Sequence, residues 1–411
     1  MDQAISTVNP MADTTIEFEA APDVLIDLDR SEQGDLHTEE MLINMGPQHP
    51  STHGVLRIVL RTDGEMVLEA IPHIGYLHRC AEKIGENLPP YQYIPYTDRM
   101  DYLAGMNNNQ GFALAVEKLK GIEVPARAQA LRVIFAELNR IASHLVSLGT
   151  YGLDMGAFTP FLYCFREREM ILDLFEAACG ARLTYSYLTI GGSTQDLPEG
   201  WVERCREFLD YFEPKITDYN NLLSFNHIFV KRTGRVGVIS LEDAIAFGLT
   251  GPVLRASGIR WDLRKIMPYD GYEKYEFDVP IGQAGGTEEI PHGIEVGDCW
   301  SRYYVRVLEM TQSIRIVRQA MDQLPSGDFV APKVKNLKLP DDEVYVEVEN
   351  PRGQLGFYVR GDGSAIPSRV KARGPSFCNL SITSHICRNI MLADVPAIIG
   401  SIDVVMGEVD R

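Results

Sequence analysis

The sequence lacks every short motif by which nucleotide-binding enzymes and the commonest hydrolases are usually recognised. It contains no Gly-x-Gly-x-x-Gly and no Gly-Lys pair, which excludes the usual dinucleotide cradle and the Walker A loop. His-Glu-x-x-His and Gly-x-Ser-x-Gly are also missing, so neither a zincin helix nor a hydrolase nucleophile elbow is expected. The sequence therefore predicts a chain that binds no nucleotide of its own.

Cysteine is sparse and irregularly spaced, at positions 80, 164, 179, 205, 299, 378 and 387. The count of seven is odd, and no two cysteines are separated by only two residues. This pattern excludes the usual spacings of zinc and iron–sulfur sites and gives no disulfide framework. It predicts reduced, mostly buried thiols and no bound metal.

Long apolar runs are absent as well. No stretch approaches the roughly 20 apolar residues of a membrane-spanning helix, and the first residues do not resemble a secretory signal. The sequence thus predicts a cytoplasmic protein, or one peripheral to a membrane. Residues 1–40 hold eleven acidic residues and only Arg30, and so contribute −10 of the net charge of −18. We expect an acidic, solvated tail there, and an acidic body that suits neither nucleic acid nor anionic lipid.

Hydrophobic patterning divides the remaining chain into three parts, which are residues 41–100, 101–324 and 325–411. The first part predicts a small antiparallel sheet, because residues 55–61 and 66–70 are rich in β-branched and aliphatic residues and flank Asp63-Gly64. The overall expectation is an α+β fold.

The middle part predicts a bundle of long helices. Apolar residues recur with the helical period in residues 131–148 and again in 161–179. Further candidate helices cover residues 101–119, 200–224 and 300–323. The last part predicts short strands at 344–348, 355–359 and 369–372, while 282–297 is interpreted as a surface loop and 325–340 as a connector.

Three loops carry residues that suit proton chemistry. Residues 46–54 hold His49 and His53, but the prolines around them make a helical metal-binding pair improbable. Residues 96–102 contain Asp98, a candidate helix cap, and end on Tyr102. Residues 152–156 place Asp154 between glycines. Taken alone, a satisfied histidine, a packed tyrosine and a turn aspartate are the commoner interpretations.

Charged residues also recur on helical stripes. Glu137, Arg140 and His144 fall at i, i+3 and i+7, and Arg166, Glu169 and Asp173 share another stripe. Both sets are interpreted as paired charges that stabilise a helical bundle.

Several of the loops and helical stripes described above resemble motifs of the family of the quinone-site subunit of bacterial respiratory complex I, an NADH:quinone oxidoreductase. Residues 45–57 (Met-Gly-Pro-Gln-His-Pro-Ser-Thr-His-Gly-Val-Leu-Arg) are similar to the signature loop of that family. Other motifs that match it in register are residues 72–79, 98–102, 137–144, 159–169, 254–258 and 401–411. The resemblance runs from about residue 41 to the last residue.

The resemblance implies a fold like that of the large subunits of nickel–iron hydrogenases, whose paired cysteines hold the metal. Here Cys80 stands alone and residues 403–406 contain no cysteine, so a thiolate cage cannot be assembled. The family's quinone headgroup pocket would take the place of the metal, and the chain would bind no cofactor itself.

The family's quinone-ligating histidine and tyrosine correspond to His53 and Tyr102, and the acid that partners the histidine corresponds to Asp154. His49 and Met155 belong to the same pocket motifs. Arg79 and Arg99 lie in motifs that the family places near an iron–sulfur cluster of a neighbouring subunit. The implied partners are the iron–sulfur subunits of the peripheral arm and a membrane-arm subunit that completes the quinone channel. The implied location is the cytoplasmic side of the cell membrane.

The sequence departs from the family at Thr184, where a histidine near the cluster is common, and at Thr189, where arginine is usual. Without that histidine, the cluster potential should depend less on pH, which suggests a low-potential quinone such as menaquinone. The connector at 325–340 is shorter than in many relatives. Two alternatives stay open: a hydrogenase-type metal enzyme, and a subunit of a related ferredoxin-linked quinone reductase or a non-catalytic scaffold.

Overall fold

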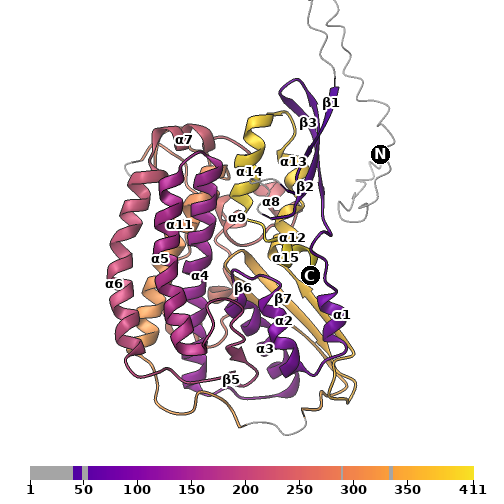
Figure 1. Ribbon diagram of the computed structural model, residues 1–411, viewed down its shortest axis with the longest axis vertical. Coiled ribbons are helices and arrows are strands. Elements are labelled where there is room, and N and C mark those ends of the chain that lie inside the picture. Colours follow the sequence, from indigo (N-terminus) through magenta and orange to yellow (C-terminus); the bar gives the residue numbers. More distant parts are fainter. Residues whose placement is uncertain (1–39, 49–53, 288–289, 333–336) are drawn as a thin grey trace, which may run out of the picture.

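The computed structural model describes residues 40–48, 54–287, 290–332 and 337–411. Long helices stand side by side on one flank, and the sheets with the C-terminal segment form the other (Figure 1). Residues 1–39 of the predicted acidic tail lie outside the described residues, and so do His49 and His53. The mixture of helices and antiparallel sheets confirms the expected α+β fold.

The N-terminal sheet contains the predicted hairpin. β2 (Arg57–Asp63) pairs antiparallel with β3 (Met66–His73), and β1 (Glu40–Met45) pairs with β2 along the other edge. Gly64 has a positive φ of 58°, which the tight turn requires and which side chains with a Cβ rarely adopt. A fourth strand, β9 (Ile390–Met391), pairs with β3, so the C-terminal region extends this sheet.

The five predicted long helices are confirmed: α3 (Gly105–Lys120), α4 (Ala126–Asp154), α5 (Phe158–Cys179), α6 (Trp201–Tyr219) and α11 (Cys299–Asp322). The apolar stripe of α4 packs against its neighbours in the main hydrophobic core, which explains its helical period. α6 continues into the short π-helix η3 (Asn220–Ser224), so the predicted helix over 200–224 changes its hydrogen bonding before it ends.

The C-terminal sheet contains the three predicted strands: β6 (Glu343–Asn350), β7 (Gly353–Arg360) and β8 (Arg369–Arg373), in that antiparallel order. Helix α3 packs closely on this sheet. A Cβ atom added to Gly111 would lie only 3.0 Å from Cγ2 of Val348, so glycine permits this approach.

Short helices and strands fill the remaining connections, and periodicity did not predict most of them. They are α1 (Ala81–Gly85), α2 (Pro90–Asp98), β4 (Leu188–Thr189), β5 (Gly192–Ser193), α7 (His227–Thr233), α8 (Leu241–Ala246), α9 (Gly251–Ala256), α10 (Leu263–Ile266), η4 (Tyr272–Lys274), α12 (Pro375–Leu380), α13 (Thr383–Ile386), η5 (Leu392–Asp394), α14 (Val395–Ile402) and α15 (Met406–Asp410).

Three predictions about loops are corrected. Residues 96–98 of the loop predicted at 96–102 belong to the helix α2, which begins at Pro90, because proline fits the first helical turn; Pro95 lies inside the helix. Asp98 is the last residue of α2, and so it caps no following helix. Residues 282–297 are irregular as predicted, but Ile290 and Ile294 are buried, so the segment is only partly a surface loop.

The thiol prediction holds for the described chain. All seven cysteines are free, and four of them are buried, while Cys80 is exposed. No helix in the described parts of the chain is both long enough and apolar enough to cross a membrane.

The charge stripe on α4 is confirmed as a buried network of paired groups. The Glu137 carboxylate accepts hydrogen bonds from Arg140, Arg264, Tyr272 and Ser313 and is completely buried. Burial alone would raise the pKa of Glu137, but the two guanidinium groups and the two hydroxyls lower it to about 2.

Two further residues extend the buried network. His144 contacts Glu309 at 2.9 Å, and Arg255 bridges Glu309 to Glu349. The charges therefore lie inside the bundle in mutually compensating pairs, which is the arrangement that burial of ions requires.

The stripe on α5 is paired differently from the prediction. Arg166 bonds Glu167, whereas Glu169 and Asp173 both bind Arg182, which comes from the loop after the helix. The loop thus brings Arg182 to the stripe as a second cation. The spacing of residues within the helix could not reveal this pairing.

We predict that Glu137→Ala lowers the free energy of unfolding by roughly 3–5 kcal/mol, because Arg140 and Arg264 lose their buried counterion. Denaturant unfolding of the purified protein measures this. Glu213→Ala is the matched control, since Glu213 forms an exposed pair with Arg318 and should cost at most about 1 kcal/mol. Equal losses in the two variants would contradict this interpretation of the network.

Candidate functional site

The candidate site is organised around the C-terminal segment that follows α14. Residues 401–410 are all buried, although Ser401, Asp403, Glu408 and Asp410 are polar. Asp403 separates α14 from α15 and has a left-handed backbone, with φ 59° and ψ 57°. A buried polar segment must find its partners within the protein, and it finds them in the motifs singled out above.

The motif at 72–79 binds the end of this segment. The backbone N–H groups of Gly75 and Leu77 donate to the two carboxylate oxygens of Asp410, at 2.8 and 2.7 Å. His78 Nδ1 lies 2.7 Å from the Asp410 carbonyl and so donates to it. The backbone N–H of Arg79 donates to the carbonyl of Arg411. This loop and the chain end therefore hold each other in one geometry.

The two predicted arginines meet beside residue 407. The Arg79 guanidinium donates to the carbonyl of Arg99 at 2.9 Å and to that of Gly407 at 3.3 Å. A Cβ atom added to Gly407 would lie 2.6 Å from the Met100 carbonyl, so only glycine allows this approach. Arg79 and Arg99 are both exposed, and they give this part of the surface a positive character.

Tyr102 lies between α2 and α3 and is half-buried. Burial and the neighbouring Asp101 carboxylate raise the pKa of Tyr102, against the lowering influence of Arg352 and Arg79. The phenol is therefore protonated at neutral pH and can act as a hydrogen-bond donor.

Arg352 joins the surroundings of Tyr102 to the C-terminal segment. Its guanidinium donates to Asp101 at 2.9 Å, to Ser143 at 3.0 Å, and to the carbonyl of Asp403 at 3.0 Å. It also lies 3.4 Å from the Asp403 carboxylate. Sequence reasoning missed both Arg352 and Asp403, and their spacing contains no signal, since 251 residues separate Arg352 from Asp101.

Asp154 is the last residue of α4 and lies against α14. A Cβ atom added to Gly400 would lie 2.9 Å from Asp154 Oδ2 and 2.7 Å from Cδ2 of Tyr151. Met155, which follows, is half-buried against the main core. The glycine on α14 thus creates the space in which the Asp154 carboxylate sits.

The loop with His49 and His53 is described only at its ends. Gly54 has a positive φ of 126°, and a Cβ atom there would lie 3.9 Å from Cγ of Met406. Gly54, which follows His53 in the chain, therefore lies near Met406, the residue before the Gly407 to which Arg79 donates.

Asp98 performs a different role from the cap that was predicted. Its Oδ2 accepts hydrogen bonds from the backbone N–H and the hydroxyl of Ser186, both at 2.8 Å. Burial raises the pKa of Asp98 to about 6, against the lowering effect of Ser186. Ser186 and Thr184 both have left-handed backbones, so this contact helps to fix the loop that carries Thr184.

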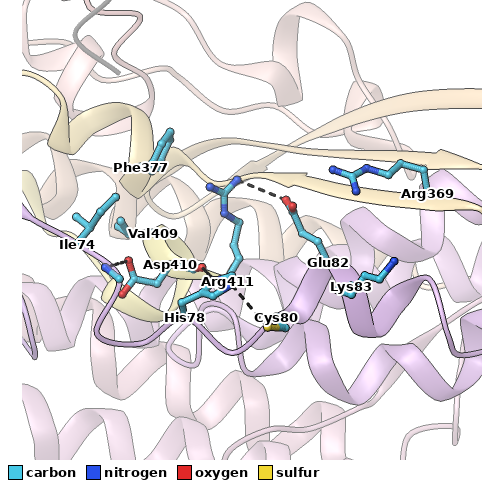
Figure 2. Close-up of a pocket in the computed structure, with 11 residues that line it drawn as sticks. Ile74, His78, Cys80, Glu82, Lys83, Arg369, Phe377, Val409, Asp410 and Arg411 are labelled. Carbon is cyan, nitrogen blue, oxygen red and sulfur yellow. Dashed lines mark hydrogen bonds and ion pairs between the residues drawn. The ribbon is translucent and has the colours of Figure 1, made fainter. Parts of the chain in front are cut away.

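A cavity of about 340 Å³ is lined in part by the end of the C-terminal segment (Figure 2). His78, Cys80, Asp410 and Arg411 line it, and Glu82 faces Arg411 at 3.6 Å. A second cavity, of about 470 Å³, shares Phe377 and Arg411 with it and is lined by the cations Lys371 and Arg373. Neither Tyr102 nor Asp154 lines these two cavities.

Metal ligation has little support among the residues that the structure describes. No group of three or more His, Cys, Asp or Glu side chains there is arranged to hold an ion. What the arrangement offers is a phenol, exposed guanidinium groups and several buried carboxyl groups around one chain segment. Such a set can donate protons and stabilise negative charge.

Comparison with known proteins shows which proteins the chain is similar to. The sequence model of the family described as respiratory-chain NADH dehydrogenase, 49 Kd subunit, matches residues 154–338 and 332–411. The chain is 52% identical to the D subunit of NADH-quinone oxidoreductase from Chlorobium luteolum, over 92% of this chain and 95% of the relative. It is 53% identical to the protein of that name from Desulforamulus reducens, over 91% and 99%. The D 1 subunit of Cytophaga hutchinsonii is 49% identical, over 92% and 97%.

We predict that Gly400→Ala destabilises the protein by about 1–3 kcal/mol, because the methyl group would overlap Tyr151 and displace Asp154. Thermal or denaturant unfolding measures the change. Gly149→Ala on α4 is the control, since its Cβ would meet only ordinary contacts at 3.4 Å and alanine favours the helix. A Gly400→Ala variant as stable as Gly149→Ala would contradict the proposed close packing at Asp154.

Proposed function

Because the chain belongs to the family of the 49 kDa subunit of respiratory-chain NADH dehydrogenase, we propose that it forms the quinone headgroup pocket of a proton-translocating NADH:quinone oxidoreductase. His53 and Tyr102 are the proton donors of this pocket, and Asp154 is the partner of His53. The observation that carries the proposal is the convergence of Gly54, Arg79, Arg99 and Asp154 on residues 400–407.

Two-electron reduction of a quinone consumes two protons, and each developing oxyanion needs a nearby donor. A phenol kept protonated by burial, such as Tyr102, is suited to donate to one quinone oxygen. An imidazole titrates near neutral pH and can donate both a hydrogen bond and a proton. The two side chains thus match the two protons that the reaction needs.

Asp154 would orient the imidazole of His53. A carboxylate beside an imidazole favours one tautomer and stabilises the protonated ring. After the proton has left for the quinone, negative charge remains in the pocket. In this proposal that charge, or a movement of Asp154, is the signal that drives proton translocation elsewhere in the complex.

Electrons would arrive from an iron–sulfur cluster of a neighbouring peripheral-arm subunit. The exposed guanidinium groups of Arg79 and Arg99 are suited to face such a cluster, because cations beside a cluster stabilise its reduced form. His49 and Met155 belong to the pocket side of the same region. No metal of its own is needed by this chain for the chemistry.

A membrane-arm subunit would complete the pocket, with the chain attached peripherally on the cytoplasmic side. Phe158 and Leu162 at the start of α5, four to eight residues beyond Asp154, expose 61% and 51% of their surface. Exposed apolar side chains so close to a functional residue are typical of a protein interface. The surface beside Asp154 therefore supports a partner at this end of the pocket.

The hydrogenase alternative has no observation in its favour. Cys80 is exposed, and its thiol lies 3.7 Å from His78 Nε2. Two thiolate pairs would be needed to hold a nickel–iron centre. A ferredoxin-linked relative of the complex would use the same pocket, and the name shared by the relatives favours NADH as the source of electrons.

We predict that His53→Ala and Tyr102→Phe each lower quinone reduction by roughly a hundredfold, because each removes a positioned proton donor. Turnover of the purified complex with a soluble quinone measures this, and subunit content checks assembly. Tyr96→Phe is the control, since Tyr96 is exposed on α2 only six residues earlier. Normal turnover in both pocket variants would refute the assignment.

The departure at Thr184 gives a second prediction. Without an imidazole at this position, the midpoint potential of the neighbouring cluster should not change with pH, which suits menaquinone. Redox titration of the complex, followed by the paramagnetic signal of the cluster, measures it between pH 6 and 9. Thr184→His should introduce a slope, because protonation of the imidazole would then accompany reduction. A clear slope in the unaltered complex would argue against this explanation.

A further inference from the structure

Tyr102 occupies a tight turn that two hydrogen bonds close. The backbone N–H of Ala104 donates to the carbonyl of Asp101 at 3.1 Å, and the N–H of Leu103 donates to Asp101 Oδ1 at 3.2 Å. Tyr102 and Leu103 are therefore the two central residues of a four-residue turn. The backbone of this turn sets the direction in which the Tyr102 side chain leaves the chain.

Helix α3 begins directly after this turn, and its N-cap residue offers it no side-chain acceptor. The N-cap is Ala104, whose side chain is a methyl group. The first N–H groups of a helix have no partner within the helix and need an acceptor from elsewhere. Asn139, on α4, provides one, because its Oδ1 accepts from the backbone N–H of Met106 at 3.0 Å.

The same amide group also binds the turn. Asn139 Nδ2 donates at 3.0 Å to the carbonyl of Leu103, the residue that follows Tyr102. Asn139 is completely buried, so these two hydrogen bonds are made away from water. A neutral amide supplies both the donor and the acceptor that the two backbone groups require. Asn139 thus joins the turn of Tyr102 and the start of α3 to α4.

The residue before Tyr102 is held from the other flank. Asp101 Oδ2 accepts from the Arg352 guanidinium at 2.9 Å, and the same nitrogen of Arg352 donates to the Ser143 hydroxyl at 3.0 Å. Ser143 follows Asn139 by four residues on α4, so the two side chains lie on one face of that helix. Both chain neighbours of Tyr102 are therefore tied to α4, one directly and the other through Arg352.

The helix that holds this turn also carries Asp154. Asp154 is the last residue of α4, fifteen residues or about 22 Å of helix beyond Asn139. An α-helix changes its length little, because each backbone hydrogen bond spans only four residues. One element therefore determines the place of the turn around Tyr102 and the place of Asp154.

We propose, on the basis of the function proposed above, that Asn139 is a positioning residue for Tyr102. Its amide holds the turn in the geometry in which the phenol reaches a quinone oxygen. Asn139 itself neither touches the quinone nor exchanges a proton. Misplacement of a reacting group by about 1 Å can cost a hundredfold in rate, so the support of the turn matters for turnover. Ser143 gives a second, weaker support through Arg352 and Asp101.

Asn139→Leu in the intact complex tests the proposal, because leucine has the branched shape of asparagine but neither a donor nor an acceptor. It should lower the kcat of quinone reduction roughly tenfold. In a complex that already carries Tyr102→Phe, the same substitution should cause no further loss, because no phenol is left to position. A double-mutant cycle on kcat measures this dependence.

Ser143→Ala is the milder variant and gives the same cycle if Asn139→Leu prevents assembly. It removes one acceptor of Arg352 and should lower kcat about two- to threefold, again only when Tyr102 is present. Gln319→Leu is the matched control. The amide of Gln319, on α11, likewise donates to a backbone carbonyl and accepts from a backbone N–H, both of Glu276. This control should leave quinone reduction unchanged.

Three outcomes separate the possibilities. Equal fractional losses with Tyr102 and with Phe at this position would overturn the inference, because the amide would then act on the structure as a whole. Normal kcat in Asn139→Leu and Ser143→Ala, together with slow quinone reduction in Tyr102→Phe, would also overturn it and leave the proposed pocket intact. Normal quinone reduction in Tyr102→Phe would instead refute the role of Tyr102 in the proposed function.

Discussion

The burial of one polar chain segment, residues 401–410, is the constraint on which the rest of the structure depends. Asp410 is held by two backbone N–H groups of the 72–79 motif, and Asp403 is held by Arg352. Charged groups are buried only where such partners exist, because the cost of leaving water is otherwise several kcal/mol for each ion. Every motif that contacts the segment is therefore fixed relative to the others through it.

The scaffold also buries charged groups that do not contact this segment. The network around Glu137 joins α4 to α10 and η4, and Arg255 with Glu309 and Glu349 joins α9, α11 and β6. Such pairs add little net stability compared with apolar packing, but they specify which helix faces which. Arg352 links the Asp101 neighbour of Tyr102 to Asp403, and Asp154 lies beside Gly400 on α14.

The functional proposal depends on how burial and nearby charges set the acid strength of Tyr102. Burial raises the pKa of Tyr102, and the guanidinium groups of Arg352 and Arg79 limit the increase. The phenol therefore stays protonated at neutral pH and is suited to donate a hydrogen bond and a proton. In the proposed function, electrons enter from a neighbouring subunit beside the exposed guanidinium groups of Arg79 and Arg99.

The sequence by itself determined the local structure and the identity of the family. The helical period of residues 131–148 and the turn at Asp63-Gly64 specify their elements through contacts within a few residues. The motif from residue 45 to 57 and the closing motif at 401–411 carry the family resemblance. The roles of His53, Tyr102 and Asp154 rest on that resemblance, because no spacing rule links three positions so far apart in the sequence.

Tertiary structure alone decided which distant residues share a site. Asp410 and Gly75 are 335 residues apart, Arg352 and Asp101 are 251 apart, and Ser186 and Asp98 are 88 apart. Their meeting depends on how distant helices, sheets and loops pack together, and no period or propensity encodes that packing. For the same reason the role of Asp98 gave no signal in the sequence: burial raises the pKa of its carboxyl group to about 6, and only the folded chain brings Ser186 beside it.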